Sequence, residues 1–462
     1  MSGFLAPPGF GSAPGEASTS DLPGLAEPHN ISIQQIELPE AEPIEESALE
    51  RLAHYPYQVF VLSEYGRPIY VSCGQEEQLC ALFALIGIFV NRVRHWSGDM
   101  LHSISSRNLH AHFLFRKPLI LCIVSKRREQ LAAQLDVLFD QIVSTISRKQ
   151  LEGVYEKRGD NYDLRRLLQG TDKYMDSCLE GWQTDLSQIS CAIRVFPLPA
   201  PERDFLSTTI ATTITAAAPE GVLFGIVLAH RQLVSMVRYK KYTINPKDLH
   251  ILINFVSNNS TISVCPIWTP ICLPYFNDNG FLHAYISSLW EGSAAYLLLL
   301  SVDRNAFNTL NTIKEGITEK LKANTKLFPG IESAISTQQM FQISNIGAGS
   351  DAMWNFLYKN RSSQQVCLSA LRPPIVNDEE RQHIVRTVGR LYGVLKSVEG
   401  TRVIYMRRKR DVLLVRAENS YDLQCILSPF CTPANAWILG DKLLKALKTH
   451  EGKHFITHTL SF

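Results

Sequence analysis

The order in which strand-like and helix-like stretches follow one another most constrains the fold of this chain. Two runs rich in β-branched and aromatic residues, 57–63 and 68–72, flank the turn signal Tyr65-Gly66-Arg67, and a helix-like stretch follows at 75–95. Strand-like runs and a long helix with apolar residues at helical spacing complete the unit, at 101–106, 109–115, 119–124 and 127–147. An antiparallel sheet covered by helices on both faces accounts for this order.

Units of the same kind recur twice along the chain. The second has a hairpin at 221–238, a helix at 246–256, three strand-like runs and a helix at 307–321. The third begins near residue 353, with a helix at 379–398, three strand-like runs, a helix at 434–447 and a last strand at 455–460. Two strands, a helix, three strands and a helix is the order of a longin domain. The sequence therefore predicts an α/β (α+β) fold of three longin-like domains, at 53–182, 186–330 and 335–462.

Residues 1–52 are predicted to form a disordered acidic tail. The first fifty residues hold nine Asp or Glu and no Lys or Arg, and they are rich in Pro, Gly and Ser. Such a segment buries too little apolar area to offset its ordering entropy. The rest of the chain carries a net charge of +11. The tail either masks basic surface or only solvates the chain, and the second interpretation is favoured. No signal peptide is predicted, because no basic stretch precedes an apolar one.

Residues 79–90 read Leu-Cys-Ala-Leu-Phe-Ala-Leu-Ile-Gly-Ile-Phe-Val, with no polar interruption over three helical turns. Twelve residues are too few for a membrane span, which needs about 20. The domain's own sheet can cover only one side of this helix. The other side must meet the second or third unit, or another chain. We predict a partner interface formed by Leu79, Leu82, Phe83, Ile86, Phe89 and Val90.

Motifs for covalent or metal chemistry are almost absent, and we expect no catalytic residue, metal or cofactor. The ten cysteines form no Cys-x-x-Cys pair, which suits free thiols in a reducing cytosol. His450-Glu451-Gly452-Lys453-His454 matches His-Glu-x-x-His formally, but it lies where a helix is predicted to end. A solvated turn is favoured over a zinc site there. His110 and His112 share one face of a predicted strand, and two ligands alone make a poor zinc site.

Four segments of the sequence resemble one protein family. The most specific is Trp268-Thr-Pro-Ile-Cys-Leu-Pro-Tyr-Phe-Asn-Asp-Asn-Gly-Phe-Leu-His-Ala-Tyr285. The others are Phe60–Tyr70, Asn161–Gly170 and, more weakly, Phe356–Lys359. They resemble signatures of the SAND family, the monensin-sensitivity vacuolar-fusion proteins, which are unrelated to the DNA-binding domain of the same acronym. The four segments fall in the family's order, and the chain is identified as a member on that basis.

The resemblance implies three longin domains and a subunit of a heteromeric guanine-nucleotide exchange factor, without covalent chemistry. Its substrate would be a late-endosomal Rab GTPase of the Rab-seven class, in endosome maturation, autophagy and fusion with the lysosome or vacuole. It implies an obligate tri-longin partner of the calcium-caffeine-zinc-sensitivity type, paired through the first longin domains, with room for a third scaffold subunit. It also implies a cytoplasmic protein held peripherally on endosomal and lysosomal or vacuolar membranes. A non-catalytic longin adaptor or tether subunit is the alternative.

The segment around Trp268 is predicted to be an edge strand or a loop. Pro266 and Pro270 flank it, and proline cannot donate to a sheet ladder. An edge that carries a large aromatic side chain invites a partner. The tryptophan either folds back onto its own domain or, as we hypothesise, forms with Pro270 a docking site for the early-endosomal Rab that recruits the complex.

The densest basic run, Arg407-Arg408-Lys409-Arg410, falls in a predicted hairpin turn. Four cations at a loop tip repel one another and suit an anionic target. A solvated turn, a phosphoinositide-rich endosomal membrane and nucleic acid are the three interpretations. Nucleic acid is the least favoured, because aromatic residues are not interleaved with the basic ones. We predict no nucleic-acid partner.

Overall fold

The computed structural model describes residues 51–52, 54–127, 130–158, 162–338, 340–370, 373–375, 377–397 and 402–462. The described residues form one compact unit. The predicted tail lies outside the described residues up to residue 50, but its last two residues do not. Leu52 is buried with the core of the first domain, and its carbonyl accepts a hydrogen bond from the Gln58 side chain at 2.7 Å. The folded part therefore begins before residue 53.

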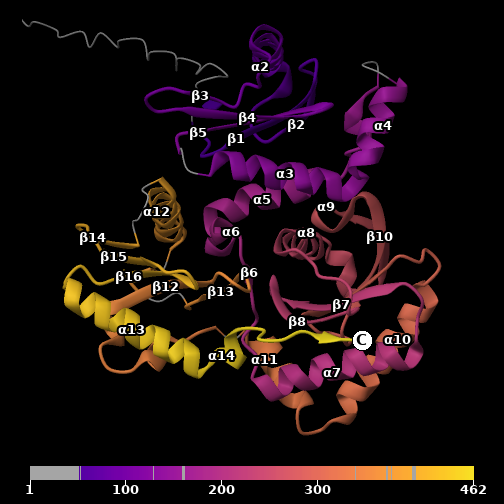
Figure 1. The fold of residues 1–462 in the computed structure, drawn as a ribbon, viewed down its shortest axis with the longest axis vertical. Helices are drawn as coiled ribbons and strands as arrows, with labels where there is room; N and C mark the ends of the chain where they lie inside the picture. The colour runs from indigo at the N-terminus through magenta and orange to yellow at the C-terminus, as the bar shows by residue number, and fades with distance from the viewer. Residues whose placement is uncertain are drawn as a thin grey trace, which may run out of the picture. The chain divides into compact units, whose positions relative to one another are not determined.

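The first domain is a five-stranded antiparallel sheet in the order β2-β1-β5-β4-β3 (Figure 1). Its strands are β1 (Gln58–Ser63), β2 (Pro68–Val71), β3 (Ser103–Ser105), β4 (His110–Arg116) and β5 (Leu119–Ser125). Helix α2 (Glu76–Ser97) packs on one face. The opposite face is covered by α3 (Leu131–Ile146), α4 (Arg148–Arg158), a 3₁₀ turn (Leu164–Arg166) and α5 (Asp172–Thr184). The predicted sandwich is confirmed here.

A close contact between two glycines fixes α2 against the β1–β2 turn. Gly66 has a φ of +80°, and a Cβ added to it would lie 2.9 Å from the carbonyl oxygen of Phe83. A Cβ on Gly87 would in turn lie 3.2 Å from the Gly66 Cα. Asn91 and Arg94 then hold Glu64, through its carbonyl at 2.8 Å and its carboxylate at 2.9 Å. Only glycines allow this approach, so the turn decides which face of α2 points inward.

The second domain is built on β7 to β11, with helices on both faces of the sheet (Figure 1). The strands are β7 (Val222–Ala229), β8 (Gln232–Arg238), β9 (Ile267–Leu273), β10 (Asp278–Ser288) and β11 (Ala295–Ser301). One face carries α7 (Ala200–Ala217), α10 (Phe307–Ala323) and α11 (Phe328–Thr337). The other carries α8 (Pro246–Ser257) and a 3₁₀ turn (Ser260–Ser263), with α9 (Pro274–Asn277) between β9 and β10.

The third domain repeats the arrangement with β12 to β16. Its strands are β12 (Met353–Asn360), β13 (Gln365–Leu368), β14 (Val403–Arg407), β15 (Val412–Ala417) and β16 (Tyr421–Leu427). Helix α12 (Asp378–Ser397) packs on one face and α13 (Pro433–Thr449) on the other. Two 3₁₀ turns (Ile343–Ile346 and Ser350–Ala352) precede β12, and α14 (Glu451–His454) follows α13.

The second and third sheets each gain a sixth strand from another part of the chain. Strand β6 (Ile193–Arg194), which follows α6 (Leu186–Ser190), pairs in parallel with β13 of the third sheet. Strand β17 (Leu460–Ser461), near the end of the chain, pairs in parallel with β8 of the second sheet. The prediction of a last strand at 455–460 in the third domain was therefore wrong in extent and in place. The two exchanged strands tie the second and third domains together.

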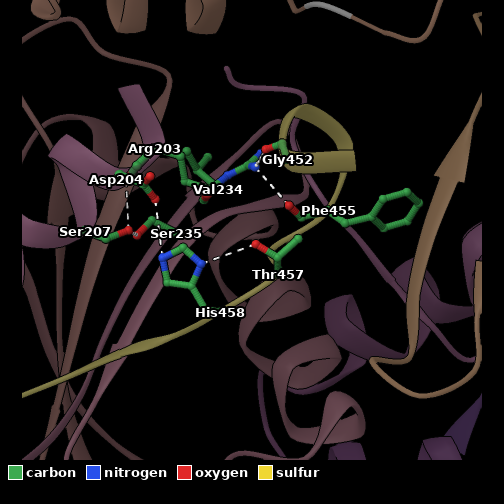
Figure 2. Close-up of polar contacts among 9 residues, drawn as sticks. All are labelled: Arg203, Asp204, Ser207, Val234, Ser235, Gly452, Phe455, Thr457 and His458. Carbon is green, nitrogen blue, oxygen red and sulfur yellow. Dashed lines mark hydrogen bonds and ion pairs between the residues drawn. The ribbon is translucent and has the colours of Figure 1, made fainter. Parts of the chain in front are cut away.

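Arg203 on α7 anchors the segment that leads to β17 (Figure 2). Its side chain is 5% exposed and donates only to backbone carbonyls. The acceptors in the second domain are Val234 at 3.2 Å and Phe196 at 2.7 Å. Those after α13 are Phe455 at 3.0 Å, Lys453 at 3.0 Å and Gly452. Burial lowers the pKa of Arg203 to about 10, so the guanidinium stays charged at neutral pH.

Candidate functional site

Helix α2 has two apolar faces, and the structure separates them. Four of the six residues predicted for the partner interface are core residues of the first domain, namely Leu79, Phe83, Ile86 and Val90, all 7% exposed or less. Leu82 is half-buried against the same core. Of the six, Phe89 alone is exposed, at 55%. It points outward together with Leu85 at 50% and Ile88 at 62%, which the prediction omitted. We call these three exposed residues the outer face of α2.

No other described segment of the chain covers the outer face of α2. The core cluster that includes α2 contains only first-domain residues. The second and third domains instead contact the opposite side of the first sheet, through α3, α4 and α5. Coverage of α2 by the second or third unit, the alternative kept open from the sequence, is therefore not what the described residues show. An exposed apolar stripe of just over one helical turn is a candidate interaction surface.

Among the described residues, α2 is also the helix long and apolar enough to cross a membrane, by length and composition only. It has 22 residues, so the sequence argument that the apolar run is too short for a span does not hold. Its inner face, however, fills the core beneath the first sheet. That burial, with the Gly66–Gly87 contact, is the packing of a helix on a folded domain.

Trp268 lies on the edge strand of the second sheet, as predicted. Strand β9 pairs with β10 alone, with Trp268 opposite Tyr285 and Pro270 opposite His283. The indole is half-buried, stacked on the His283 ring at 5.5 Å and edge-on to Phe307 at 6.2 Å. It thus folds largely onto its own domain. Pro270 is exposed, whereas the end of β9 is buried against α3 of the first domain.

The basic run occupies the β14–β15 turn, but its four cations are not equivalent. Arg408 is half-buried. Its guanidinium group donates to the Asp411 carboxylate at 2.6 and 2.5 Å and to the Thr387 hydroxyl at 2.9 Å. Its charge is compensated within the hairpin, so the prediction of four available cations overcounts by one. Arg407, Lys409 and Arg410 are exposed. The anionic surface that they were predicted to meet stays a prediction.

The two histidines of the His-Glu-x-x-His motif do not lie on one helix. His450 ends α13, whereas His454 closes α14 and is 3% exposed. The His454 ring packs on Phe341 at 5.0 Å, and burial lowers its pKa to about 4. The predicted solvated turn is thus partly wrong, because the second histidine is a core residue. The described residues contain no group of three or more His, Cys, Asp or Glu that could hold a metal ion.

A polar network joins the first and second domains and contains two carboxyl groups of raised pKa. Asp140 on α3 accepts from the Tyr275 hydroxyl at 2.9 Å, and Lys247 donates to that hydroxyl at 2.6 Å. Asp248 is fully buried, with one oxygen on the Tyr275 amide at 3.2 Å and the other without a partner. Desolvation raises the pKa of both carboxyls to about 6. Ionising them opposes folding at neutral pH.

Asp248→Asn is expected to stabilise the chain by about 1–3 kcal/mol at pH 7, with no gain at pH 4. The folded chain holds the Asp248 proton more tightly than the unfolded chain does. The protonated carboxyl therefore contributes its whole stabilisation at pH values below the unfolded pKa. That contribution is lost as pH rises through about 6. Urea unfolding at several pH values, followed through the transition of the second domain, measures this, with the exposed Asp351→Asn as a control. Parallel pH profiles for wild type and Asp248→Asn would contradict the assignment.

Comparison with known families agrees with the three domains. Models of the first, second and third longin domains of FUZ, MON1 and HPS1 match residues 57–178, 220–319 and 352–451. Each match falls inside one of the three predicted domains. The predicted fold of three longin domains is confirmed.

Relatives align over most of the chain. Vacuolar fusion protein MON1 homolog A of Gallus gallus is 32% identical over 404 residues, covering 86% of this chain and 71% of the relative. The Homo sapiens homolog A is 31% identical, covering 90% of this chain and 63% of its own length. Protein SAND of Takifugu rubripes is 31% identical, covering 90% of this chain and 79% of its own. The resemblance seen in the sequence is confirmed, and this chain belongs to the MON1/SAND family of vacuolar fusion proteins.

Proposed function

We propose that this chain is one subunit of a heteromeric guanine-nucleotide exchange factor that activates a late-endosomal Rab GTPase of the Rab-seven class. The observation that carries the proposal is the outer face of α2. Leu85, Ile88 and Phe89 are at least half exposed on a folded longin domain. Obligate interfaces bury such apolar surface. The proposed occupant is a second tri-longin protein of the calcium-caffeine-zinc-sensitivity type, with a third scaffold subunit as a further member.

Exchange of this kind needs no catalytic side chain and no cofactor. By linkage, a complex that binds the nucleotide-free GTPase more tightly than the loaded form must weaken nucleotide binding by the same factor. A thousandfold weakening needs about 4 kcal/mol of differential binding. The site would be composite, formed by the first longin domains of the two subunits, and would act by reshaping the GTPase switch loops around magnesium and phosphate.

The proposed place of action is the cytoplasmic surface of early and late endosomes and of the lysosome or vacuole, in endosome maturation, early-to-late Rab conversion, autophagy and fusion. The names of the relatives, which are vacuolar fusion proteins, support this setting. The exposed Arg407, Lys409 and Arg410 supply a contact for a phosphoinositide-rich membrane, at about 1 kcal/mol for each cation near the surface.

The edge strand β9 is the proposed docking site for the early-endosomal Rab. Trp268→Ala is expected to lower recruitment to vesicles bearing that Rab about tenfold, because it removes the aromatic anchor beside Pro270. Vesicle flotation measures recruitment. Phe307→Leu loosens the packing behind Trp268 without changing the edge, and serves as the control. Unchanged recruitment of Trp268→Ala would place the docking site elsewhere.

Release of a fluorescent GDP analogue from the late-endosomal Rab tests the central proposal. We expect the chain alone to leave release slow and the co-purified pair to accelerate it about a hundredfold or more. An early-endosomal Rab as substrate controls for specificity. A folded pair that leaves release unchanged would overturn the exchange proposal and favour a non-catalytic longin adaptor or tether subunit.

A further inference from the structure

A cavity of about 350 Å³ lies where the three domains meet. Its walls come from α5 and α6, from β6, from the β7–β8 turn, and from β12, β13 and α12. Three arginines line it, one from each of three separate segments: Arg194 on β6, Arg231 in the β7–β8 turn and Arg381 on α12. The volume lies in the range of small-molecule sites.

The β7–β8 turn holds Arg231 in an unfavourable backbone conformation. His230 and Arg231 have φ values of +49° and +61°, the two central positions of a tight hairpin turn where Asn-Gly is usual. Positive φ costs about 1–3 kcal/mol for a residue with a side chain. His230 lies within 2.6 Å of the Ile335 carbonyl, which fixes the turn. The strained backbone at Arg231 therefore places its guanidinium group in the wall of the cavity.

The acidic side chains of the cavity do not neutralise its arginines. Among the described residues, neither Asp185 nor Glu180 makes an ion pair with them. The Asp185 carboxylate instead accepts from the Ser187 amide at 2.8 Å and hydroxyl at 2.7 Å, and Glu180 is exposed. Arg381 is half-buried and pairs with Asp378 at 3.3 Å, while its Nε has no hydrogen-bond partner among the described residues. This Nε–H lies beside Arg194 and Arg231, neither of which makes an ion pair among the described residues, and the three groups together suit an anion.

We propose that this cavity binds a small, water-soluble molecule that carries two or more phosphate groups. Guanidinium groups bind phosphate oxygens in a bidentate manner, and three of them from separate segments match more than one phosphate. The polar residues Ser177, Asn355 and Ser369 add hydroxyl and amide groups to the wall. The adjoining apolar cavity, lined in part by Trp182 and Ile251, is about 80 Å³, which is too small for an acyl chain. The bound molecule would join the three domains at their junction.

Isothermal titration of the full chain, co-purified with its partner, tests the proposal with three probes. They are inositol hexakisphosphate, pyrophosphate, and vesicles that contain a phosphatidylinositol phosphate. We expect binding of at least one free probe, with a rise in thermal midpoint on saturation. Binding of vesicles but of neither free probe would overturn the soluble-ligand proposal in favour of a lipid headgroup. If none of the three probes binds, the proposed site is wrong.

Arg231→Gly separates binding from folding. Glycine suits the positive φ, so this variant should fold at least as well as wild type while binding the free probe about tenfold more weakly or worse. Arg194→Gln should weaken binding to a similar extent. Arg410→Gln, in the exposed β14–β15 turn, should leave it unchanged. Equal affinity in wild type and Arg231→Gly, or loss in Arg410→Gln alone, would show that the probe binds the surface and not the cavity.

Discussion

Ile88→Asp is expected to separate the chain from its tri-longin partner. Ile88 is the most exposed of the three residues on the outer face of α2, at 62%, and it points away from the core of its own domain. A carboxylate there would be buried without a counter-charge at the centre of an apolar interface. We expect affinity to fall about a hundredfold or more, which is roughly 3 kcal/mol, and exchange activity to fall with it. Co-purification and titration of the two chains measure the loss.

The third domain offers a matched control for this variant. Ile438 on α13 is a helical isoleucine of similar exposure, at 51%. Ile438→Asp should therefore leave pairing intact. Phe83→Asp is unsuitable as a test, because Phe83 is buried in the first core and its replacement unfolds the domain. Should Ile88→Asp pair as tightly as wild type, the partner surface lies elsewhere and the exposed face of α2 has another role.

The element order could be predicted from the sequence because strands and helices of this fold leave strong periodic signals. The hairpin of β1 and β2 and the long helix α3 follow such signals closely. Helix α7 was missed. It carries a threonine-rich run whose hydroxyls bond back to carbonyls one turn earlier, such as Thr213 to Thr209 at 2.7 Å. Such residues favour strands by propensity, and tertiary packing overrides that preference.

The orientation of α2 could not be predicted from its own residues. A helix that is apolar all round gives no sign of which side meets the sheet. The Gly66–Gly87 contact decides it, and that contact joins two segments that only the fold brings together. Similarly, Arg408 was counted as a free cation, although Asp411 three residues later was the available sign that its charge is paired.

The two-residue strands β6 and β17 also escaped prediction, because their pairing partners lie far away along the chain. The same is true of Arg203. Its charged neighbours Glu202 and Asp204 suggest an exposed cation. The fold instead surrounds it with five carbonyls, from the second domain and from the segment after α13. The residues that tie the domains together are thus the ones that local pattern reveals least.

Arg203→Met is expected to release the C-terminal segment from the second domain. The variant keeps much of the side-chain volume but leaves five carbonyls without their donor, at a cost of about 3–5 kcal/mol. Because three domains need not unfold together, a single unfolding midpoint is a poor measure. Amide hydrogen exchange is the better one. We expect protection to fall at Phe455, whose amide bonds to Glu451, and at Phe462, whose amide bonds to Arg238.

Arg238 provides the comparison that makes the Arg203 result interpretable. It also holds the C-terminal segment, donating to Thr459 at 3.3 Å, but it is partly exposed and its other acceptors are local. Arg238→Met should therefore cost about 1 kcal/mol or less, since water replaces the lost bonds. Equal, small losses of protection in both variants would mean that the pairing of β17 with β8 holds the segment, and that the buried guanidinium only fills space.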